Sequence, residues 1–177
     1  MDARIPAGTA PHIVVGYDGT RPAAFALEWA VREARLRDCD LWAVRVLDNG
    51  NAPHAPYAGA HALPRTGPAE RELEHVVERA RRTWPRVHHA VRRDDLAARG
   101  LARAAEGAQL LVLGTRGPSG PGAPPLGPTA SACLRIAPCP VVFVGLERAP
   151  WAQDGAFDDA PARRTAEPVG SAGGGAR

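Results

Sequence analysis

The residues best suited to binding chemistry lie in a glycine-rich stretch from Gly114 to Pro128. An apolar run, Leu110 to Leu113, ends abruptly at Gly114, and Gly117 and Gly127 follow it. Residues after Gly127 have helical spacing, so the pattern predicts a buried strand, a glycine loop and a helix N-terminus. Such an arrangement presents free backbone N–H groups and the positive end of a helix dipole to one point, where they can hold phosphate. The same glycines also fit a plain surface turn, and the spacing alone leaves both interpretations open.

The elements that must position this loop alternate between strand and helix. Residues 13–17 form a short apolar run that ends at Asp18-Gly19, which predicts the first buried strand. Thr20 can cap the next helix, whose apolar residues recur at i, i+3 and i+4 between Ala23 and Ala34. A nearly continuous apolar run over 41–47 predicts a second strand that is covered on both faces, as in a parallel sheet.

The rest of the chain repeats this alternation. After a long loop over 49–68, which is rich in proline and glycine, a helix is expected from about Ala69 to Trp84. A weaker strand over 87–91 follows, and Asp94 or Asp95 can cap a third helix that ends near Gly107. Strands are expected over 110–113 and 141–144, with a fourth helix between them. We therefore expect five strands and four helices.

Five alternations without a clear hairpin signal predict an α/β fold, a five-stranded, mainly parallel sheet with helices on both faces. Ligands of such sheets bind beyond the carboxyl ends of the strands, where the strand order reverses. The candidate ligand segments are therefore those that follow strands one, two and four: 17–20, 46–48 and 114–117. The glycine loop lies where a ligand site is expected, which favours a functional loop over a plain turn.

Composition excludes several classes of protein. The net charge is +3 and every basic residue is arginine, but the arginines alternate with acidic residues, so we expect no nucleic-acid partner. No apolar stretch approaches the ~20 residues of a membrane span, and no signal peptide is evident, so a cytoplasmic protein without a membrane partner is expected. Three cysteines without CxxC spacing suggest neither a disulfide framework nor a metal site.

Three segments together resemble the universal stress protein (UspA) family. Residues 13–20, IVVGYDGT, resemble the family's first strand and its Asp-x-Ser/Thr turn. The spacing Gly114-x2-Gly117-x9-Gly127 resembles the family's ATP-binding signature, and residues 134–144 resemble its closing helix and strand. The resemblance implies a Rossmann-like, adenine nucleotide alpha hydrolase-like sheet with strand order 3-2-1-4-5. It covers residues 11–146, between a flexible leader over 1–10 and a disordered tail over 147–177.

The same resemblance implies which residues bind a nucleotide. An acidic residue after the first strand and a backbone group near the end of the second contact adenine, and the signature glycines approach ribose and phosphates. The implied cofactor-binding residues are Asp18, Thr20, Val46, Gly114, Gly117, Gly127 and Thr129. The signature's Ser/Thr after the third glycine is here Pro128, which offers neither a hydroxyl nor an N–H. Thr129, one residue later, is expected to substitute in part.

The resemblance implies a cytoplasmic stress-response or signalling domain that binds ATP, with Mg²⁺, as a regulatory ligand. We expect no catalysis, because the sequence has no P-loop lysine and no nucleophile elbow. A homodimer through the last strand, Val141–Val144, is also implied. Two alternatives stay open. One is a nucleotide-free dimeric interaction module whose phosphate site has decayed at Pro128, and the other is an enzyme of a related nucleotide-binding α/β fold.

Overall fold

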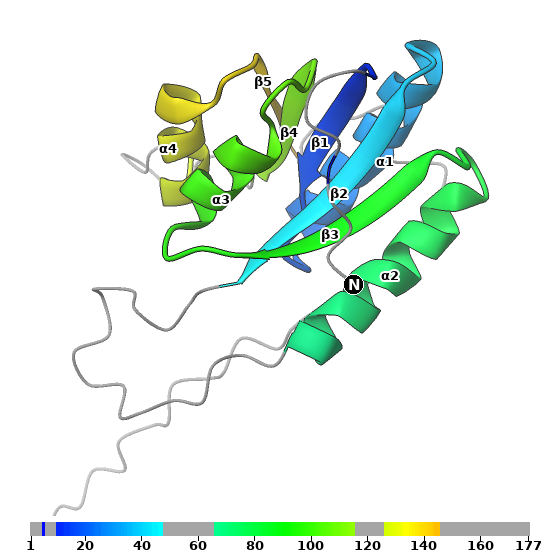
Figure 1. Ribbon diagram of the computed structural model, residues 1–177, viewed down its shortest axis with the longest axis horizontal. Coiled ribbons are helices and arrows are strands. Elements are labelled where there is room, and N and C mark those ends of the chain that lie inside the picture. The colour runs from blue at the N-terminus through cyan, green and yellow to red at the C-terminus, as the bar shows by residue number, and fades with distance from the viewer. Residues whose placement is uncertain (1–4, 6–9, 48–65, 116–125, 146–177) are drawn as a thin grey trace, which may run out of the picture.

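Strands and helices alternate strictly along the chain, as the sequence predicts (Figure 1). The computed structural model describes residue 5 and residues 10–47, 66–115 and 126–145. The strands are β1 (His12–Gly16), β2 (Asp40–Leu47), β3 (Val87–Arg93), β4 (Leu110–Thr115) and β5 (Val141–Gly145). The helices are α1 (Arg21–Leu36), α2 (Thr66–Arg81), α3 (Ala97–Ala104) and α4 (Pro128–Ile136).

All strand pairs in the sheet are parallel, and the strand order is β3-β2-β1-β4-β5. The expected order 3-2-1-4-5 is therefore confirmed. Helices α1 and α2 pack on one face of the sheet, and α3 and α4 pack on the other. The strand order reverses between β1 and β4, so the connections that follow these two strands lead to opposite faces of the sheet, and a crevice is expected beyond their carboxyl ends.

Alternate residues of each strand enter two separate apolar cores, one on each face. Ile13 and Val15 of β1 belong to the core under α1 and α2, whereas Val14 belongs to the core under α3. This two-sided burial is why the strands read as continuous apolar runs. Cys39 and Cys133 are buried and Cys139 is partly buried, and burial raises the pKa of the Cys133 thiol to about 11.

The predicted start of α1 is confirmed in detail. Thr20 is the N-cap residue, and its hydroxyl oxygen accepts a hydrogen bond from the Ala23 N–H at 3.4 Å. Pro22 lies in the first turn, where its missing N–H costs nothing. Seven residues of α1 are buried: Pro22, Ala23, Ala26, Leu27, Ala30, Val31 and Ala34.

The predicted bounds of other elements need correction. Helix α2 begins at Thr66, inside the stretch expected to be a loop, and ends at Arg81 rather than at Trp84. Its last turn tightens to i→i−3 bonds, from the Arg82 N–H to the Arg79 carbonyl at 3.2 Å and from the Thr83 N–H to the Ala80 carbonyl at 3.0 Å. The Trp84 indole N–H donates to the Cys39 carbonyl at 3.0 Å. Leu134 of α4 is 60% exposed, although it shares the helical spacing of the apolar residues after Gly127.

Several strands are longer than their apolar runs because a parallel partner continues beside them. Leu47 pairs with Arg93, and Thr115 pairs with Gly145. The residues at these strand ends do not belong to an apolar run, so the apolar pattern alone does not predict the extension. Residues 49–65 of the expected loop and all of the expected tail lie outside the described residues. Ile5, in the expected leader, is buried in the core under α3.

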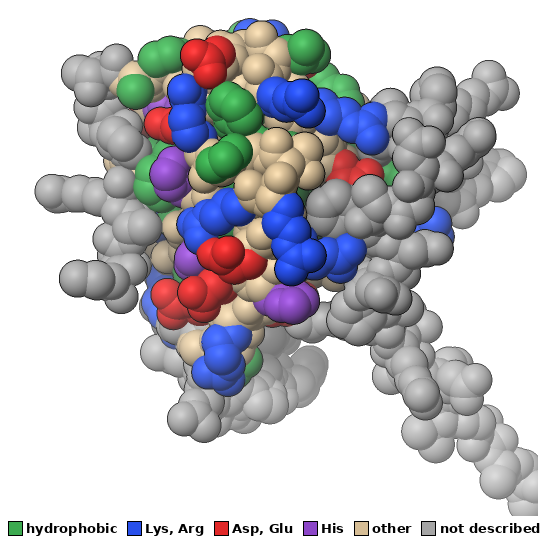
Figure 2. Space-filling view, turned by 90° about the vertical axis from the view of Figure 1, so that its right-hand side faces the viewer, with side chains coloured by type: hydrophobic (Ala, Val, Ile, Leu, Met, Phe, Trp, Pro, Cys, Tyr) green, Lys and Arg blue, Asp and Glu red, His purple; other side chains and the backbone are tan. Residues whose placement is uncertain are grey.

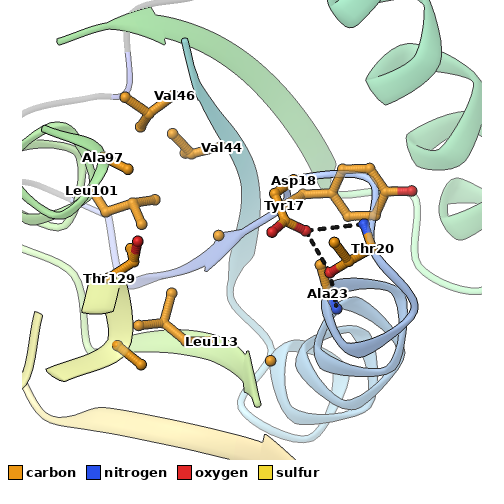
Figure 3. A pocket seen from close by; sticks show the side chains of 13 residues that line it. Tyr17, Asp18, Thr20, Ala23, Val44, Val46, Ala97, Leu101, Leu113 and Thr129 are labelled. Atoms are coloured by element: carbon orange, nitrogen blue, oxygen red, sulfur yellow. Dashed lines mark hydrogen bonds between the residues drawn. The ribbon is translucent and has the colours of Figure 1, made fainter. Parts of the chain in front are cut away.

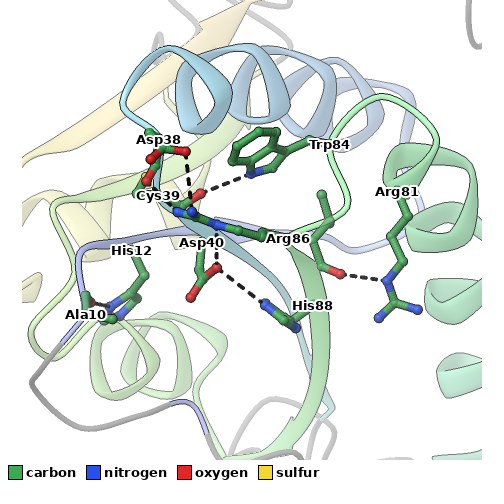
Figure 4. A network of polar contacts seen from close by, with 10 residues as sticks. Ala10, His12, Asp38, Cys39, Asp40, Arg81, Trp84, Arg86 and His88 are labelled. Atoms are coloured by element: carbon green, nitrogen blue, oxygen red, sulfur yellow. Dashed lines mark hydrogen bonds and ion pairs between the residues drawn. The ribbon is translucent and has the colours of Figure 1, made fainter.

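At the amino ends of the strands, a polar network joins β2 to β3 (Figure 4). Arg86 pairs with Asp38 and with Asp40, whose carboxylate also lies 3.7 Å from the His88 Nε2. The His88 ring stacks on Trp42, with ring centroids 4.7 Å apart. These contacts give His88 a packing role. They lie at the amino ends of the strands, opposite to the expected ligand site.

The surface over α2 and the neighbouring edge of the sheet carries mixed charge. Figure 2 shows arginine and acidic side chains side by side on this face. Some of them form ion pairs within a helix, as Arg81 and Glu78 do. No helix in the part of the chain that the structure describes has the length and apolar character of a membrane span.

Candidate functional site

A cavity of about 170 Å³ opens at the carboxyl ends of β1, β2 and β4 (Figure 3). Three helices, α1, α3 and α4, approach it with their N-terminal turns, so their positive dipole ends converge on it. The lining residues are Gly16, Tyr17, Asp18, Thr20, Ala23, Val44, Val46, Ala97, Leu101, Leu113, Gly114, Thr129 and Ala130. Five of the seven residues implied by the family resemblance are among them: Asp18, Thr20, Val46, Gly114 and Thr129.

The turn after β1 holds the Asp18 carboxylate in a fixed orientation. Its Oδ1 accepts two hydrogen bonds from Thr20, one from the N–H at 2.9 Å and one from the hydroxyl at 2.6 Å. The Oδ2 accepts none from the residues that the structure describes, and Figure 3 shows the carboxylate at the edge of the cavity. Asp18 therefore presents one free, charged acceptor to a ligand.

Val46 offers backbone groups to the same cavity. The ladder between β1 and β2 ends at Gly16 and Val44, and the Val44 carbonyl accepts from the Tyr17 N–H at 2.9 Å. Backbone groups of alternate strand residues point to the same side. The N–H and C=O of Val46 therefore point toward the β1 side, beyond the end of the ladder. A donor and an acceptor that point the same way from one residue suit the edge of a nucleobase.

The glycines of the signature serve different purposes. A Cβ on Gly114 would overlap the Pro22 carbonyl group and stand 2.7 Å from the Ala23 nitrogen, so the close approach of β4 to α1 requires glycine there. A Cβ on Gly127 would meet none of the described atoms within 4 Å. Gly127 does not line the cavity but is the N-cap residue of α4. Gly117 lies outside the described residues.

Pro128 is the first residue of α4, as expected from its fixed φ angle. The first intrahelical bond of α4 runs from the Ser131 N–H to the Gly127 carbonyl at 2.9 Å. The N–H groups of Thr129 and Ala130 belong to the unpaired first turn, and both residues line the cavity. This helix end thus offers two N–H groups and the Thr129 hydroxyl.

One wall of the cavity was missed by the reasoning from sequence. Ala97 and Leu101, one turn apart on α3, line it, and α3 packs closely against β2. Gly100 permits this approach, because a Cβ there would stand 2.8 Å from a Val46 methyl group. The only signal in the sequence was their i, i+4 spacing, which does not distinguish a cavity wall from an ordinary core face. Leu113 and Val44 complete the apolar lining.

Behind the Asp18 turn lies an ion pair that faces away from the cavity. Arg45 of β2, whose side chain is 10% exposed, donates to the Glu72 carboxylate of α2 at 2.6 Å. The Tyr17 ring points toward α2 rather than into the cavity (Figure 3). Burial, reinforced by the negative charge of Glu72, raises the pKa of the Tyr17 phenol. The turn is therefore packed between the cavity and this pair.

At the start of α3, buried Asp94 organises a second polar cluster. Its carboxylate accepts from the Leu96 N–H at 3.1 Å, from the Arg99 Nε at 2.7 Å and from Arg103 at 3.2 Å. Burial opposes the charge, but these hydrogen bonds and the two guanidinium groups hold the pKa of Asp94 below its ordinary value. The prediction that Asp94 or Asp95 caps α3 is therefore wrong: the N-cap residue is Leu96, which makes no side-chain capping hydrogen bond, and Asp94 instead accepts from the Leu96 N–H.

Within the described ranges, no group of three or more His, Cys, Asp or Glu side chains is arranged to hold a metal ion. The cavity instead combines an apolar wall, one oriented carboxylate, free backbone groups and helix N-termini. This set of groups suits a flat, partly apolar ring with an amino group, joined to an anionic end.

Comparison with known proteins gives a consistent result. A profile described as the universal stress protein family matches residues 10–145. A universal stress protein of Mycobacterium tuberculosis strain H37Rv is 35% identical over 150 residues, which cover 83% of this chain and 52% of that protein. The chain spans about half the length of the curated relatives it matches.

Solved structures show the same fold. A universal stress protein in complex with cAMP matches with a TM-score of 0.59 at 19% identity, over 78% of this chain and 98% of that one. The universal stress protein of Archaeoglobus fulgidus in complex with dAMP matches with a TM-score of 0.54 at 21% identity, over 76% and 97% of the two chains. With the family profile covering most of its length, the chain belongs to the universal stress protein family.

Proposed function

We propose that this protein binds an adenine nucleotide as a regulatory ligand in the stress response, with ATP and Mg²⁺ as the form bound in the cell. One observation carries the proposal. A single cavity unites the oriented carboxylate of Asp18, the free backbone groups of Val46 and the N-terminus of α4. The complexes of two structural neighbours with cAMP and dAMP support this choice of ligand class.

The base would lie between Val46 and Asp18, against the apolar wall formed by Ala97 and Leu101. The free carboxylate oxygen of Asp18 can only accept hydrogen bonds, and adenine offers its exocyclic amino group as a donor. Hypoxanthine carries an oxygen at the same position and would face the carboxylate with a second acceptor. The site should therefore prefer adenine.

The phosphates would lie at the N-terminus of α4. Thr129 and Ala130 supply N–H groups there, and the open space beside Gly127 allows close approach to the backbone. The cavity lining contains one carboxylate, that of Asp18, and it lies at the base end. Mg²⁺ would therefore be held by the phosphates of ATP and enter the site together with the nucleotide.

Calorimetry with AMP and IMP tests the base site. We expect AMP to bind the wild-type protein about tenfold or more tightly than IMP, because a hydrogen bond to a charged group contributes about 1.5–3 kcal/mol. In Asp18→Asn, the Thr20 N–H retains the amide oxygen as its acceptor, so the amide NH₂ turns to the cavity. The preference for AMP should then vanish or reverse.

The matched control is Asp38→Asn, an exposed carboxylate at the opposite edge of the sheet, which should leave both affinities unchanged. ATP, with and without Mg²⁺, is titrated in parallel. A folded wild-type protein that takes up none of these nucleotides would refute the proposal.

A second candidate function, a nucleotide-free interaction module, is favoured by one observation. Pro128 occupies the first position of α4 and removes one N–H from the turn that would hold phosphate. We also propose a homodimer in the cytoplasm, formed through the edge strand β5, whose residues Val141, Val142 and Phe143 are half-buried in the single chain. The dimer is compatible with either function, so nucleotide titration decides between them.

A further inference from the structure

We propose that Glu72 is a positioning residue through which helix α2 controls the nucleotide-binding turn after β1. The inference rests on the proposed function, because it concerns regulation of the same site. It extends that function by assigning the control to a helix that contributes no residue to the cavity lining.

The first part of the connection is the ion pair between β2 and α2. Arg45 lies between Val44 and Val46, both of which line the cavity, while its own side chain extends to the opposite face of the sheet. There its Nη1 contacts the Glu72 Oε2 at 2.6 Å, and the two side chains are 10% and 34% exposed. A partly buried pair of this kind is sensitive to loss of either partner, since the remaining charge is left without a counter-ion.

The second part is the contact between Glu72 and the turn itself. A Cβ on Gly19 would stand 2.6 Å from the Glu72 Oε1 and 3.8 Å from the Arg45 Nη1. Gly19 has a φ of +83°, a conformation that glycine adopts without strain. The carboxylate therefore packs directly on the backbone between Asp18 and Thr20, on the side away from the ligand.

Tyr17, at the other end of the turn, is part of the same packing. It is 5% exposed, and the charges of Glu72 and Arg45 both act on its phenol. Displacement of Glu72 would remove support from Tyr17 and Gly19 together. Asp18 lies between them, so its orientation toward the cavity would be loosened.

Coupling between two sites is reciprocal. If α2 holds the turn in its binding form, a nucleotide that fixes Asp18 must in turn stabilise α2. Hydrogen exchange can measure this effect, because a helix that opens less often exchanges its amides more slowly.

The experiment compares the full-length wild-type protein with Glu72→Gln, with and without saturating AMP, by hydrogen exchange and calorimetry. The matched control is Glu74→Gln, an exposed glutamate on the same helix. In the wild type and the control, AMP should slow exchange over residues 66–81. Glu72→Gln should lose this slowing, exchange faster over residues 17–24 without ligand, and bind AMP about fivefold or more weakly.

Glu72→Asp tests whether Glu72 positions the turn after β1 or only contributes to the stability of the fold. It retains the charge beside Arg45 but withdraws the carboxylate from Gly19 by one methylene. Faster exchange over residues 17–24, with a thermal midpoint near that of the wild type, is the expected result.

If the wild type binds AMP without any effect on α2, or if Glu72→Gln behaves like Glu74→Gln, the coupling is refuted and the proposed function stands. If the folded wild type binds neither AMP nor ATP with Mg²⁺, the proposed function fails, and the coupling fails with it. If it binds only ATP, ATP replaces AMP in the same comparison.

Discussion

Two glycines from one signature have different physical reasons to be glycine. Gly114 leaves room for the backbone of Pro22 and Ala23, so it is required by the packing of β4 on α1 whether or not a ligand binds. Gly127 has no neighbour within reach of a Cβ, so the described fold does not require glycine there. Only the second is therefore informative about a ligand that approaches the backbone.

Asp94 is the residue with the clearest predicted dependence on pH. Its folded pKa is lowered, so its contribution to stability is fully present above its unfolded pKa of about 3.9 and is lost as the pH falls through the folded value. Asp94→Asn should lower the free energy of unfolding by about 1–3 kcal/mol at pH 7, because a buried acceptor of several hydrogen bonds loses its charge.

Urea titrations of both proteins between pH 3 and 7 measure this difference. It should stay constant at neutral pH and shrink below about pH 4. A difference that grows on acidification would contradict the assigned contacts with Arg99 and Arg103.

Helix α4 shows how one residue changes what an element can do. Its N-terminus is directed at the cavity, but Pro128 leaves Thr129 and Ala130 as the donors of its first turn that line the cavity. Helix formation is undisturbed, since proline at the first position needs no hydrogen bond. Proline at this position thus removes one possible donor to an anion without weakening the helix.

Pro128→Ser restores one N–H and one hydroxyl at this position. Calorimetry should show tighter binding of ATP by about tenfold, the effect of one or two hydrogen bonds to a charged phosphate. Adenosine, which lacks phosphate, is the control ligand and should bind equally to both proteins. Equal ATP affinities would mean that the phosphates do not lie at the N-terminus of α4.

Helices α2 and α3 support the cavity in ways that differ from α4. α3 forms an apolar wall through Ala97 and Leu101, and α2 lies behind the site and reaches it through Glu72. Neither role was evident from the periodicity of these helices, which reports only that one face is buried.

In the whole molecule, β5 is one of the two edge strands of the sheet and lies next to β4. The Pro140 carbonyl accepts from the Leu111 N–H, so even-numbered residues of β5 point their backbone groups to β4. The N–H of Val141 therefore points to the free edge. An apolar edge strand of this kind is suited to pairing with a second copy.

Val141→Pro tests this arrangement. It removes an outward N–H and adds a ring at the first position of the strand, where proline is tolerated. Light scattering should show a dimer for the wild type and a monomer for the variant, with a similar thermal midpoint. A variant that is still dimeric would assign the dimer to another surface.

The sequence by itself determined the α/β class, the order of elements and the family, because these depend on local periodicity and on short motifs such as Asp18-Gly19-Thr20. It also identified five residues that share one cavity, since the carboxyl ends of parallel strands meet at one edge. Element ends were less accurate, because a neighbouring strand can extend a strand beyond its apolar run.

Only the tertiary structure decided why Gly114 is glycine, that α3 supplies a wall, and that Glu72 reaches Gly19. Each of these depends on contacts between segments far apart in the chain. Glu72 and Gly19 are on a helix and a turn separated by the whole of α1 and β2. Such contacts arise from how the layers pack, and no local pattern in the sequence encodes the distance between two side chains on different elements.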